Sequence, residues 1–268
     1  MNADATATTW SLALLFSVSG SVAGLLVAGA FLLAGRNLHT KLVPWLVSYA
    51  VGTLLGAALL VLVPESLAAL RPPVALGTLL AGILTFFILE KLVLWRHSHG
   101  DDADLDDLAS DHAHHTHAGH HAHHRTAASL VILGDAVHTF VDGIVIAAAT
   151  LTSPPLGAST ALAVIAHEIP QEAGDFGVLL AAGYSRRRAL VLNLTSGLGG
   201  LAGASLMLAF GAWAPTVVPF VLAFAAGNFM YVAMADLIPS LHRGHFDTNA
   251  VRQVVLIALG IATIGLMQ

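Results

Sequence analysis

The sequence predicts an all-α integral membrane protein with eight transmembrane helices. The chain has 268 residues, of which 56% are hydrophobic and only 10% are charged, whereas a soluble domain carries about 25% charged residues. The apolar residues form runs of about twenty, the length needed to cross a hydrocarbon core of roughly 30 Å. Cysteine is absent, which excludes disulfides and thiolate metal sites. The scarcity of basic residues also argues against a nucleic-acid partner.

Each predicted helix is an apolar run bounded by charged residues or helix breakers. No positively charged segment precedes the first run, so we expect it to be retained as a helix rather than cleaved as a signal peptide. The eight expected spans are residues 9–35, 42–64, 74–95, 127–151, 157–182, 188–212, 216–240 and 250–267. One membrane domain then consists of helices 1–3 (1–95), a cytoplasmic histidine-rich flexible loop (96–126) and helices 4–8 (127–268).

The basic residues predict the orientation, because Lys and Arg collect in short cytoplasmic loops. With the N-terminus outside, ten of the eleven basic residues fall on the inner side. They are Arg36, Lys41, Lys91, Arg96, Arg125, Arg186, Arg187, Arg188, Arg243 and Arg252, with only Arg71 outside. Both termini should therefore face outward, and the histidine loop should face the cytoplasm. The short terminal segments favour a bacterial inner (plasma) membrane.

A short sequence similarity between two spans predicts inverted repeats. "LVPESL" at 62–67 closes the second span, and "LIPSL" at 237–241 closes the seventh. The two spans run in opposite directions in the topology above. Repeats formed by spans 1–3 and 6–8 around spans 4 and 5 would produce this pattern, which is common in transporters.

Two consecutive spans contain ionisable residues at helical spacing. In the fourth span His138 and Asp142 are four residues apart, as are His167 and Gln171 in the fifth span. Residues four apart lie on one face of a helix, so two facing helices would offer two imidazoles, a carboxylate and an amide oxygen. This donor set suits Zn²⁺, Fe²⁺ or Mn²⁺ better than Ca²⁺ or Mg²⁺. We predict an intramembrane metal site here, which includes Glu168.

Carboxylates in these two spans are costly in contact with lipid. They are Asp135, Asp142, Glu168, Glu172 and Asp175. We therefore expect them to face a cation, a partner group or a water-filled path. Pro170 has no N–H to donate to the Ala166 carbonyl, so a kink is expected that leaves this oxygen free for a cation or water.

The remaining polar residues leave two interpretations open. Asp135 either lines the approach to the site or pairs with an arginine. Asn193 and Asn228 belong either to a pathway or to interhelical hydrogen bonds. The candidate pathway or supporting residues are Asp135, Thr139, Glu172, Asp175, Asp236 and Glu65.

These motifs resemble those of the ZIP family of divalent metal transporters. "HTFVDG" at 138–143 is similar to the H-N-x-x-D/E-G pattern of the family's fourth span. "HEIPQEAGDF" at 167–176 is similar to the H-E-x-P-H-E-x-G-D motif of its histidine-rich subfamily. The resemblance implies a central site for a transported divalent metal at His138, Asp142, His167 and Gln171. It also implies a 3+2+3 helix arrangement, a homodimer and movement of metal toward the cytoplasm.

The resemblance further implies that the metal is a substrate and that the chain has no resident cofactor and is not an enzyme. Zn²⁺ is the expected ion, with Fe²⁺, Mn²⁺ and Cd²⁺ as others. Other ZIP proteins hold a second adjacent ion, but the corresponding positions here are Thr139, Gln171 and Gly200. These differences favour one principal ion, and Gln171 in place of a histidine tilts selectivity toward Fe²⁺ or Mn²⁺.

The segment 96–125 contains ten histidines and six aspartates. Such a composition builds no packed core, so a flexible segment is expected. We predict weak, multivalent metal capture that fades below about pH 6, because imidazolium does not bind metal. The proposed ligands are His112, His114, His115, His117, His120, His121, His123 and His124.

Three other functions compete with uptake of metal. An intramembrane metallopeptidase would need a second histidine where Gln171 stands in "HEIPQ", so this alternative is weak. A cation exporter fits the same residues, because the spacing of ligands does not encode direction. A metal sensor that uses the histidine loop predicts binding without flux.

Overall fold

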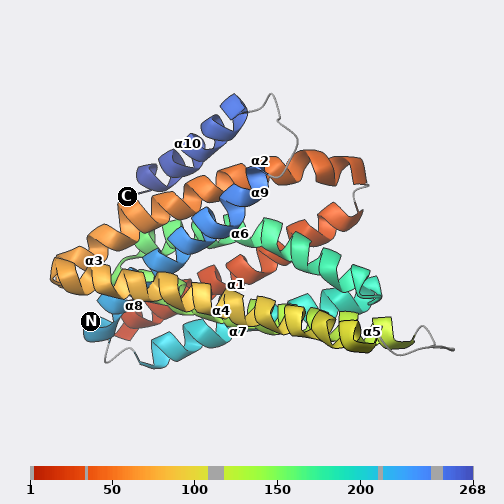
Figure 1. The fold of residues 1–268 in the computed structure, drawn as a ribbon. Coiled ribbons are helices and arrows are strands. Elements are labelled where there is room, and N and C mark those ends of the chain that lie inside the picture. The colour runs from red at the N-terminus through yellow and green to blue at the C-terminus, as the bar shows by residue number, and fades with distance from the viewer. Residues whose placement is uncertain (1–2, 34–35, 108–117, 211–213, 243–249, 268) are drawn as a thin grey trace.

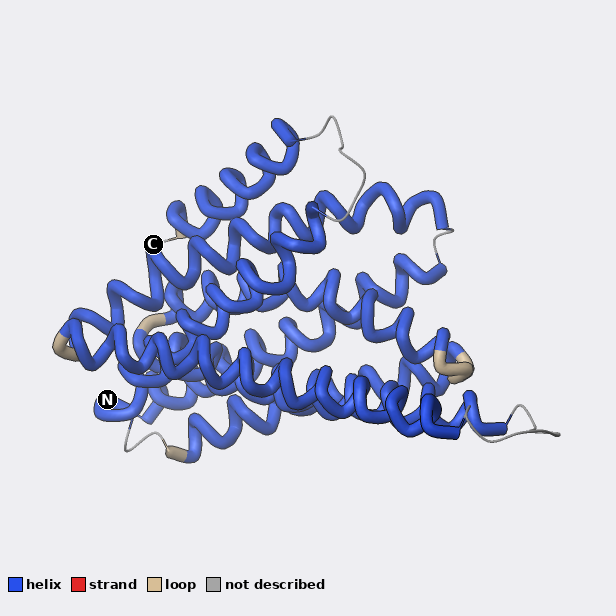
Figure 2. The backbone as a smooth tube through the Cα atoms, in the orientation of Figure 1, coloured by secondary structure: helices blue, strands red, loops and turns tan. Residues whose placement is uncertain are grey.

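The computed structural model describes residues 3–33, 36–107, 118–210, 214–242 and 250–267, and within them the chain is helical apart from short turns, with no β-strand (Figures 1 and 2). The elements in chain order are α1 (Ala3–Leu33), α2 (Arg36–Gly56), η1 (Ala57–Leu62), α3 (Val63–Ala69), α4 (Pro72–Asp107), α5 (Ala118–Thr152), α6 (Pro154–Ala181), α7 (Arg186–Ala209), α8 (Ala214–Tyr231), η3 (Val232–Leu237), α9 (Ile238–His242) and α10 (Ala250–Leu266).

Six helices are long and apolar enough to span a membrane, fewer than the eight expected. The candidate spans are Ala7–Gly24, Val43–Ala69, Pro72–Lys91, Ile132–Thr152, Arg186–Ala209 and Pro215–Leu237. Helix α10 has 17 residues, or about 26 Å at 1.5 Å per residue, which is short for a hydrocarbon core of about 30 Å. Helix α6 has 28 residues, but Glu168, Glu172 and Asp175 interrupt its apolar sequence. These two helices account for the difference.

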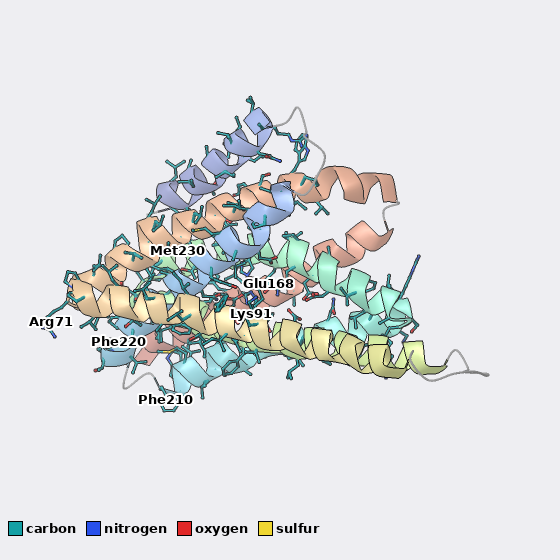
Figure 3. All side chains as sticks on the ribbon, in the orientation of Figure 1. Arg71, Lys91, Glu168, Phe210, Phe220 and Met230 are labelled. Atoms are coloured by element: carbon teal, nitrogen blue, oxygen red, sulfur yellow. The ribbon has the colours of Figure 1, made fainter. Side chains whose placement is uncertain are left out.

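The distribution of side chains is that of a membrane protein, apolar outside and polar inside. Leu80 and Leu84 of α4 are each 57% exposed, and Val251 of α10 is 76% exposed, whereas Asp135 and His167 are buried. Soluble monomers rarely expose apolar surface on this scale. Figure 3 shows Glu168 in the interior of the bundle and Arg71 at one end of it. The chain is thus an integral membrane protein with a polar centre.

The helices pack as two groups that meet around that polar centre. Helices α1, α5, α6 and α7 pack mainly on one another, while α2 pairs with α10 and α4 pairs with α8. Contacts of α2 with α6 and of α5 with α8 join the groups. Glycines permit the closest approaches. A Cβ added to Gly143 of α5 would collide with the Gly200 carbonyl of α7, and one added to Gly227 of α8 would collide with the Leu79 carbonyl of α4.

The two similar segments, "LVPESL" and "LIPSL", each begin at the last residue of a π-helical turn. Turn η1 precedes Pro64, and turn η3 precedes Pro239. At the end of each turn the N–H group bonds five residues back, from Val63 to the Ala58 carbonyl and from Ile238 to the Ala233 carbonyl. Proline cannot donate to the carbonyl four residues before it, and a wider turn is one way in which a helix accommodates this disruption.

The helices next to the histidine-rich segment extend into it. We expected a loop over 96–126, but the backbone is helical up to Asp107 in α4 and again from Ala118 in α5. Adding residues to an existing helix is easier than starting a new one, which accounts for these extensions. Residues 108–117, with His112, His114, His115 and His117, lie outside the described residues.

Candidate metal centre

The residues predicted to bind metal lie on the helical hairpin formed by α5 and α6. Ser153 separates the two helices, and its hydroxyl accepts a hydrogen bond from the Leu156 N–H at 3.3 Å. Pro154 follows at the first helical position, where a missing N–H is harmless. The tight connection makes α5 and α6 antiparallel neighbours, so the fourth-span and fifth-span motifs face each other at mid-height.

Four buried side chains converge at this point: His138, Asp142, His167 and Glu168. Their ligand atoms all lie within 4.8 Å of one another. The Nε2 atoms of the two histidines are 3.1 Å apart, and Asp142 Oδ2 lies 3.6 Å from His138 Nε2 and 3.3 Å from His167 Nε2. Ligands 2.0–2.1 Å from a tetrahedral Zn²⁺ are about 3.3 Å from each other. The two histidines and Asp142 therefore already lie close to the separations that one small cation requires, and Glu168, 3.9 Å from His167 Nε2, lies slightly farther out.

The orientation of His167 is fixed by the backbone of its own helix. Its Nδ1 lies 3.1 Å from the Ala163 carbonyl oxygen, and because a carbonyl only accepts, Nδ1 must donate. The neutral imidazole then carries its lone pair on Nε2, the atom that faces His138 and Asp142. A second-sphere carbonyl of this kind is the usual partner of a metal-binding histidine.

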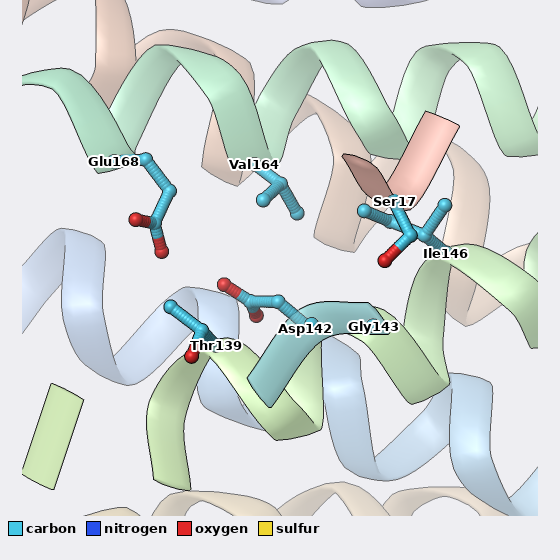
Figure 4. A pocket seen from close by; sticks show the side chains of 8 residues that line it. Ser17, Thr139, Asp142, Gly143, Ile146, Val164 and Glu168 are labelled. Carbon is cyan, nitrogen blue, oxygen red and sulfur yellow. The ribbon is translucent and has the colours of Figure 1, made fainter. Parts of the chain in front are cut away.

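The two carboxylates of the group lack hydrogen-bond donors. Both oxygens of Asp142 and both of Glu168 are buried and have no hydrogen-bond partner among the described residues. Leaving a buried polar atom unpaired costs about 1–3 kcal/mol, and more for a charged group. Figure 4 shows the two carboxylates directed toward each other from facing helices. A cation between them would relieve both costs.

Aromatic side chains and a small pocket border the four ligands. Phe86 of α4 packs against the His138 ring with centroids 5.7 Å apart, and Phe229 of α8 approaches His167 at 6.0 Å. A small cavity of about 10 Å³ adjoins Asp142 and Glu168. Its lining residues are Ser17, Thr139, Asp142, Gly143, Ile146, Val164, Glu168 and Gly200 (Figure 4). The centre thus has an apolar wall on one side and, on the other, space for about one water molecule.

Gln171 is directed at Asp135. Its amide nitrogen donates a hydrogen bond of 3.2 Å to Asp135 Oδ1, and the Ser196 hydroxyl of α7 donates to Asp135 Oδ2. Of the two interpretations of Asp135, an arginine partner receives no support from the described contacts.

Pro170 does not end helix α6. The helix continues on both sides of it, from Pro154 to Ala181.

Thr139 follows His138 in α5, and its hydroxyl is used in contacts between helices. It donates to the Ser196 carbonyl at 2.9 Å and to the Asp135 carbonyl at 3.0 Å. These bonds join α5 to α7 beside the metal centre. Gly200 belongs to the same contact between α5 and α7, because its backbone lies directly against Gly143.

The other candidate residues occupy different surroundings. Glu172 is buried, Asp175 is half-buried, and Asp236 is exposed in η3. Glu65 is half-buried in α3 and belongs to neither cluster of metal-ligand type found in the described part of the chain. The side chains of His120, His121, His123 and His124 at the start of α5 lie outside the described residues, although their backbone is helical.

Sequence reasoning missed two polar residues that adjoin the centre. Ser196 is 2% exposed and bonds Asp135, and Ser17 of α1 lines the pocket. The only signal for Ser196 was its distance of three residues from Asn193 on the same helix face. A lone serine in an apolar helix is otherwise indistinguishable from a small packing residue.

Comparison with known proteins identifies the family. The ZIP zinc transporter family profile matches residues 94–268. The chain is 30% identical to zinc transporter ZIP13 of Pongo abelii over 273 residues, which cover 94% of this chain and 76% of that protein. It is 46% identical to zinc transporter ZIP4 of Homo sapiens over 112 residues, or 42% of this chain and 17% of that protein.

A third relative is zinc transporter ZIP10 of Mus musculus, 36% identical over 158 residues, which cover 59% of this chain and 19% of that protein. The family match spans more than half of the chain and includes all four converging ligands. The chain therefore belongs to the ZIP zinc transporter family, whose members are transporters and not enzymes.

Proposed function

We propose that the chain moves Zn²⁺ across the membrane into the cytoplasm through the centre formed by His138, Asp142, His167 and Glu168. The observation that carries this proposal is the spacing of the four buried donors, 3.1 to 3.9 Å between neighbouring ligand atoms. Two imidazole nitrogens and two carboxylates suit Zn²⁺ best, and Fe²⁺, Mn²⁺ and Cd²⁺ are proposed as weaker substrates.

We further propose eight membrane passes in a 3+2+3 arrangement, with both termini outside. Helix α1 begins and α10 ends at the same end of the bundle as the turn near Arg71, and α4 ends at the opposite end, as does α6 (Figures 1 and 2). The carboxylates of α6 do not prevent a crossing, because Glu168 and Glu172 are buried inside the bundle. The paired π-turns before Pro64 and Pro239 support the inverted repeat.

A homodimer and inward direction are part of the same proposal and rest on the family resemblance. The exporter alternative uses identical ligands, so only a measurement of direction separates the two. Tracking whether cellular zinc rises or falls on expression would do this. A fall would overturn the inward direction and leave the metal centre intact.

Zinc uptake into liposomes tests the transport function. Purified protein is reconstituted, and entry of radioactive zinc is compared between the native chain and Asp142→Asn, with iron, manganese and cadmium as competitors. We expect saturable uptake that falls by about tenfold or more in Asp142→Asn, because loss of a supporting group alone costs about 10–100-fold in metal affinity. Binding without flux in the native chain would favour the sensor instead.

The histidine-rich segment is proposed to capture metal at the cytoplasmic mouth. Replacing its eight proposed ligand histidines by glutamine should change the apparent zinc affinity while leaving maximal uptake within about twofold. This difference should vanish below about pH 6, because histidine protonates with a usual pKa near 6.5 and then binds no metal. Uptake measured at pH 7.5 and 5.5 checks both statements. Complete loss of uptake at pH 7.5 would contradict them.

A further inference from the structure

A second group of buried carboxylates adjoins the metal centre and shares one residue with it. Asp135, Glu168 and Glu172 each place a carboxylate oxygen within 4.8 Å of the others. They are 4%, 1% and 1% exposed. Three carboxylates so close together repel one another strongly in a medium of low dielectric constant. Bound protons or a cation among them would relieve this repulsion.

The protein itself supplies too few donors to this group. Both oxygens of Glu168 and the Oε2 atom of Glu172 have no hydrogen-bond partner within the described ranges. Asn193 of α7, 1% exposed, lies against the Glu172 carboxylate, yet neither its amide oxygen nor its amide nitrogen makes a hydrogen bond of normal geometry there. Buried amides are almost always paired. An unpaired amide next to unpaired carboxylates indicates a ligand that all of them would bind.

Asp135 is held in place as a metal ligand usually is. Gln171 donates to one of its oxygens and Ser196 to the other, while Thr139 bonds its backbone carbonyl at 3.0 Å. A carboxylate has about four lone-pair positions, so two hydrogen bonds leave capacity for a cation. Such supporting bonds orient carboxylate ligands around metals.

The second group lies one helical turn from the first, toward one end of the bundle. Asp135 precedes His138 in α5, and Glu172 follows Glu168 in the antiparallel helix α6. Both steps lead toward the end where α5 starts and α6 ends (Figure 1). In the proposed topology this is the cytoplasmic end. An ion leaving the histidines in this direction would meet the second group next.

We propose that Asp135, Glu168 and Glu172, with the Asn193 amide oxygen, form a second binding station for a divalent cation, composed only of oxygen ligands. This inference rests on the proposed transport function, because it places the station after the histidine-containing centre on the inward path. Glu168 belongs to both sites, so an ion could move from one site to the other while bound to Glu168. Oxygen ligands hold Zn²⁺ less strongly than imidazole does, so the station favours release to the cytoplasm.

Binding of Mn²⁺ to the purified full-length chain tests this station. Mn²⁺ is the probe because oxygen-only sites suit it, whereas imidazole-rich segments prefer other metals. Equilibrium dialysis gives the bound Mn²⁺ per chain for the native protein, Glu172→Gln and Glu90→Gln. Glu90→Gln is the matched control, since it makes the same substitution at an exposed carboxylate of α4 that belongs to neither cluster. Gel filtration and thermal unfolding check that each variant is folded.

We expect Glu172→Gln to bind one Mn²⁺ fewer per chain than the native protein and Glu90→Gln to bind the same number. Asp135→Asn should repeat the loss seen with Glu172→Gln. Equal binding by the native chain and folded Glu172→Gln would overturn the station. So would an equal loss in Glu90→Gln, which would indicate an effect of charge alone. Zinc uptake that depends on Asp142 would still stand in either case, so failure of the station and failure of the transport proposal are distinguishable.

Discussion

Replacing His167 with alanine should reduce zinc uptake by at least about 100-fold, since a direct ligand matters more than the supporting groups whose loss costs about 10–100-fold. His167 contacts every other member of the centre, at 3.1 Å from His138, 3.3 Å from Asp142 and 3.9 Å from Glu168. Its loss leaves two facing carboxylates with a single imidazole. The initial rate of radioactive zinc entry into liposomes measures the effect.

Ser159→Ala is the matched control for this substitution. Ser159 is buried in the same helix, and its hydroxyl donates a hydrogen bond to the Leu156 carbonyl at 3.0 Å. It lies about 12 Å from His167 along the helix axis, at 1.5 Å per residue. We expect native uptake from Ser159→Ala. If His167→Ala retained half of the native rate while folded, the ion would not pass through the centre described above.

Gly143→Ala should destabilise the protein by about 3 kcal/mol, the upper end of the usual cost of overpacking. A Cβ at this position would collide with backbone atoms of Gly200, which cannot rotate away as a side chain would. Helices α5 and α7 would have to separate, and the bonds from Thr139 to Ser196 and from Ser196 to Asp135 would lengthen. A loss of about 3 kcal/mol lowers the midpoint of thermal unfolding by about 10 °C.

Gly174→Ala separates this packing effect from a general intolerance of alanine. Gly174 lies in α6, a few residues beyond Glu168, and an added Cβ would have no atom within 4 Å. Alanine is also the better helix former by about 1 kcal/mol. The midpoint should therefore stay the same or rise slightly. Equal midpoints for Gly143→Ala and Gly174→Ala would show that the α5–α7 contact is more tolerant than its geometry indicates.

Local periodicity accounts for the part of the metal centre that the sequence predicted. His138 and Asp142 share a face because they are four residues apart in one helix, and they meet His167 as expected. Gln171 follows the same four-residue rule, yet its amide contacts Asp135. A helix face is broad enough to serve two neighbouring groups, and spacing within one helix does not say which group a side chain will join.

Span counting from the sequence was accurate where the helices are simply apolar. It placed all of the helices that the structure describes, but α6 and α10 do not satisfy the criteria of length and composition for a membrane span. In α6 the carboxylates that lower its apolar character are the ones that face the interior. The polar centre and the weak span signal thus have the same cause.

The sequence by itself determined the membrane environment, the order of the helices and the ionisable residues on α5 and α6, because these follow from composition and from contacts within one helix. Only the tertiary structure decided that Glu168 joins two groups, that Thr139 serves packing, and that Ser196 and Asn193 of α7 adjoin them. These facts depend on the register and distance between helices. Glycine contacts such as Gly143 with Gly200 set that distance, and their partners lie far away in the chain.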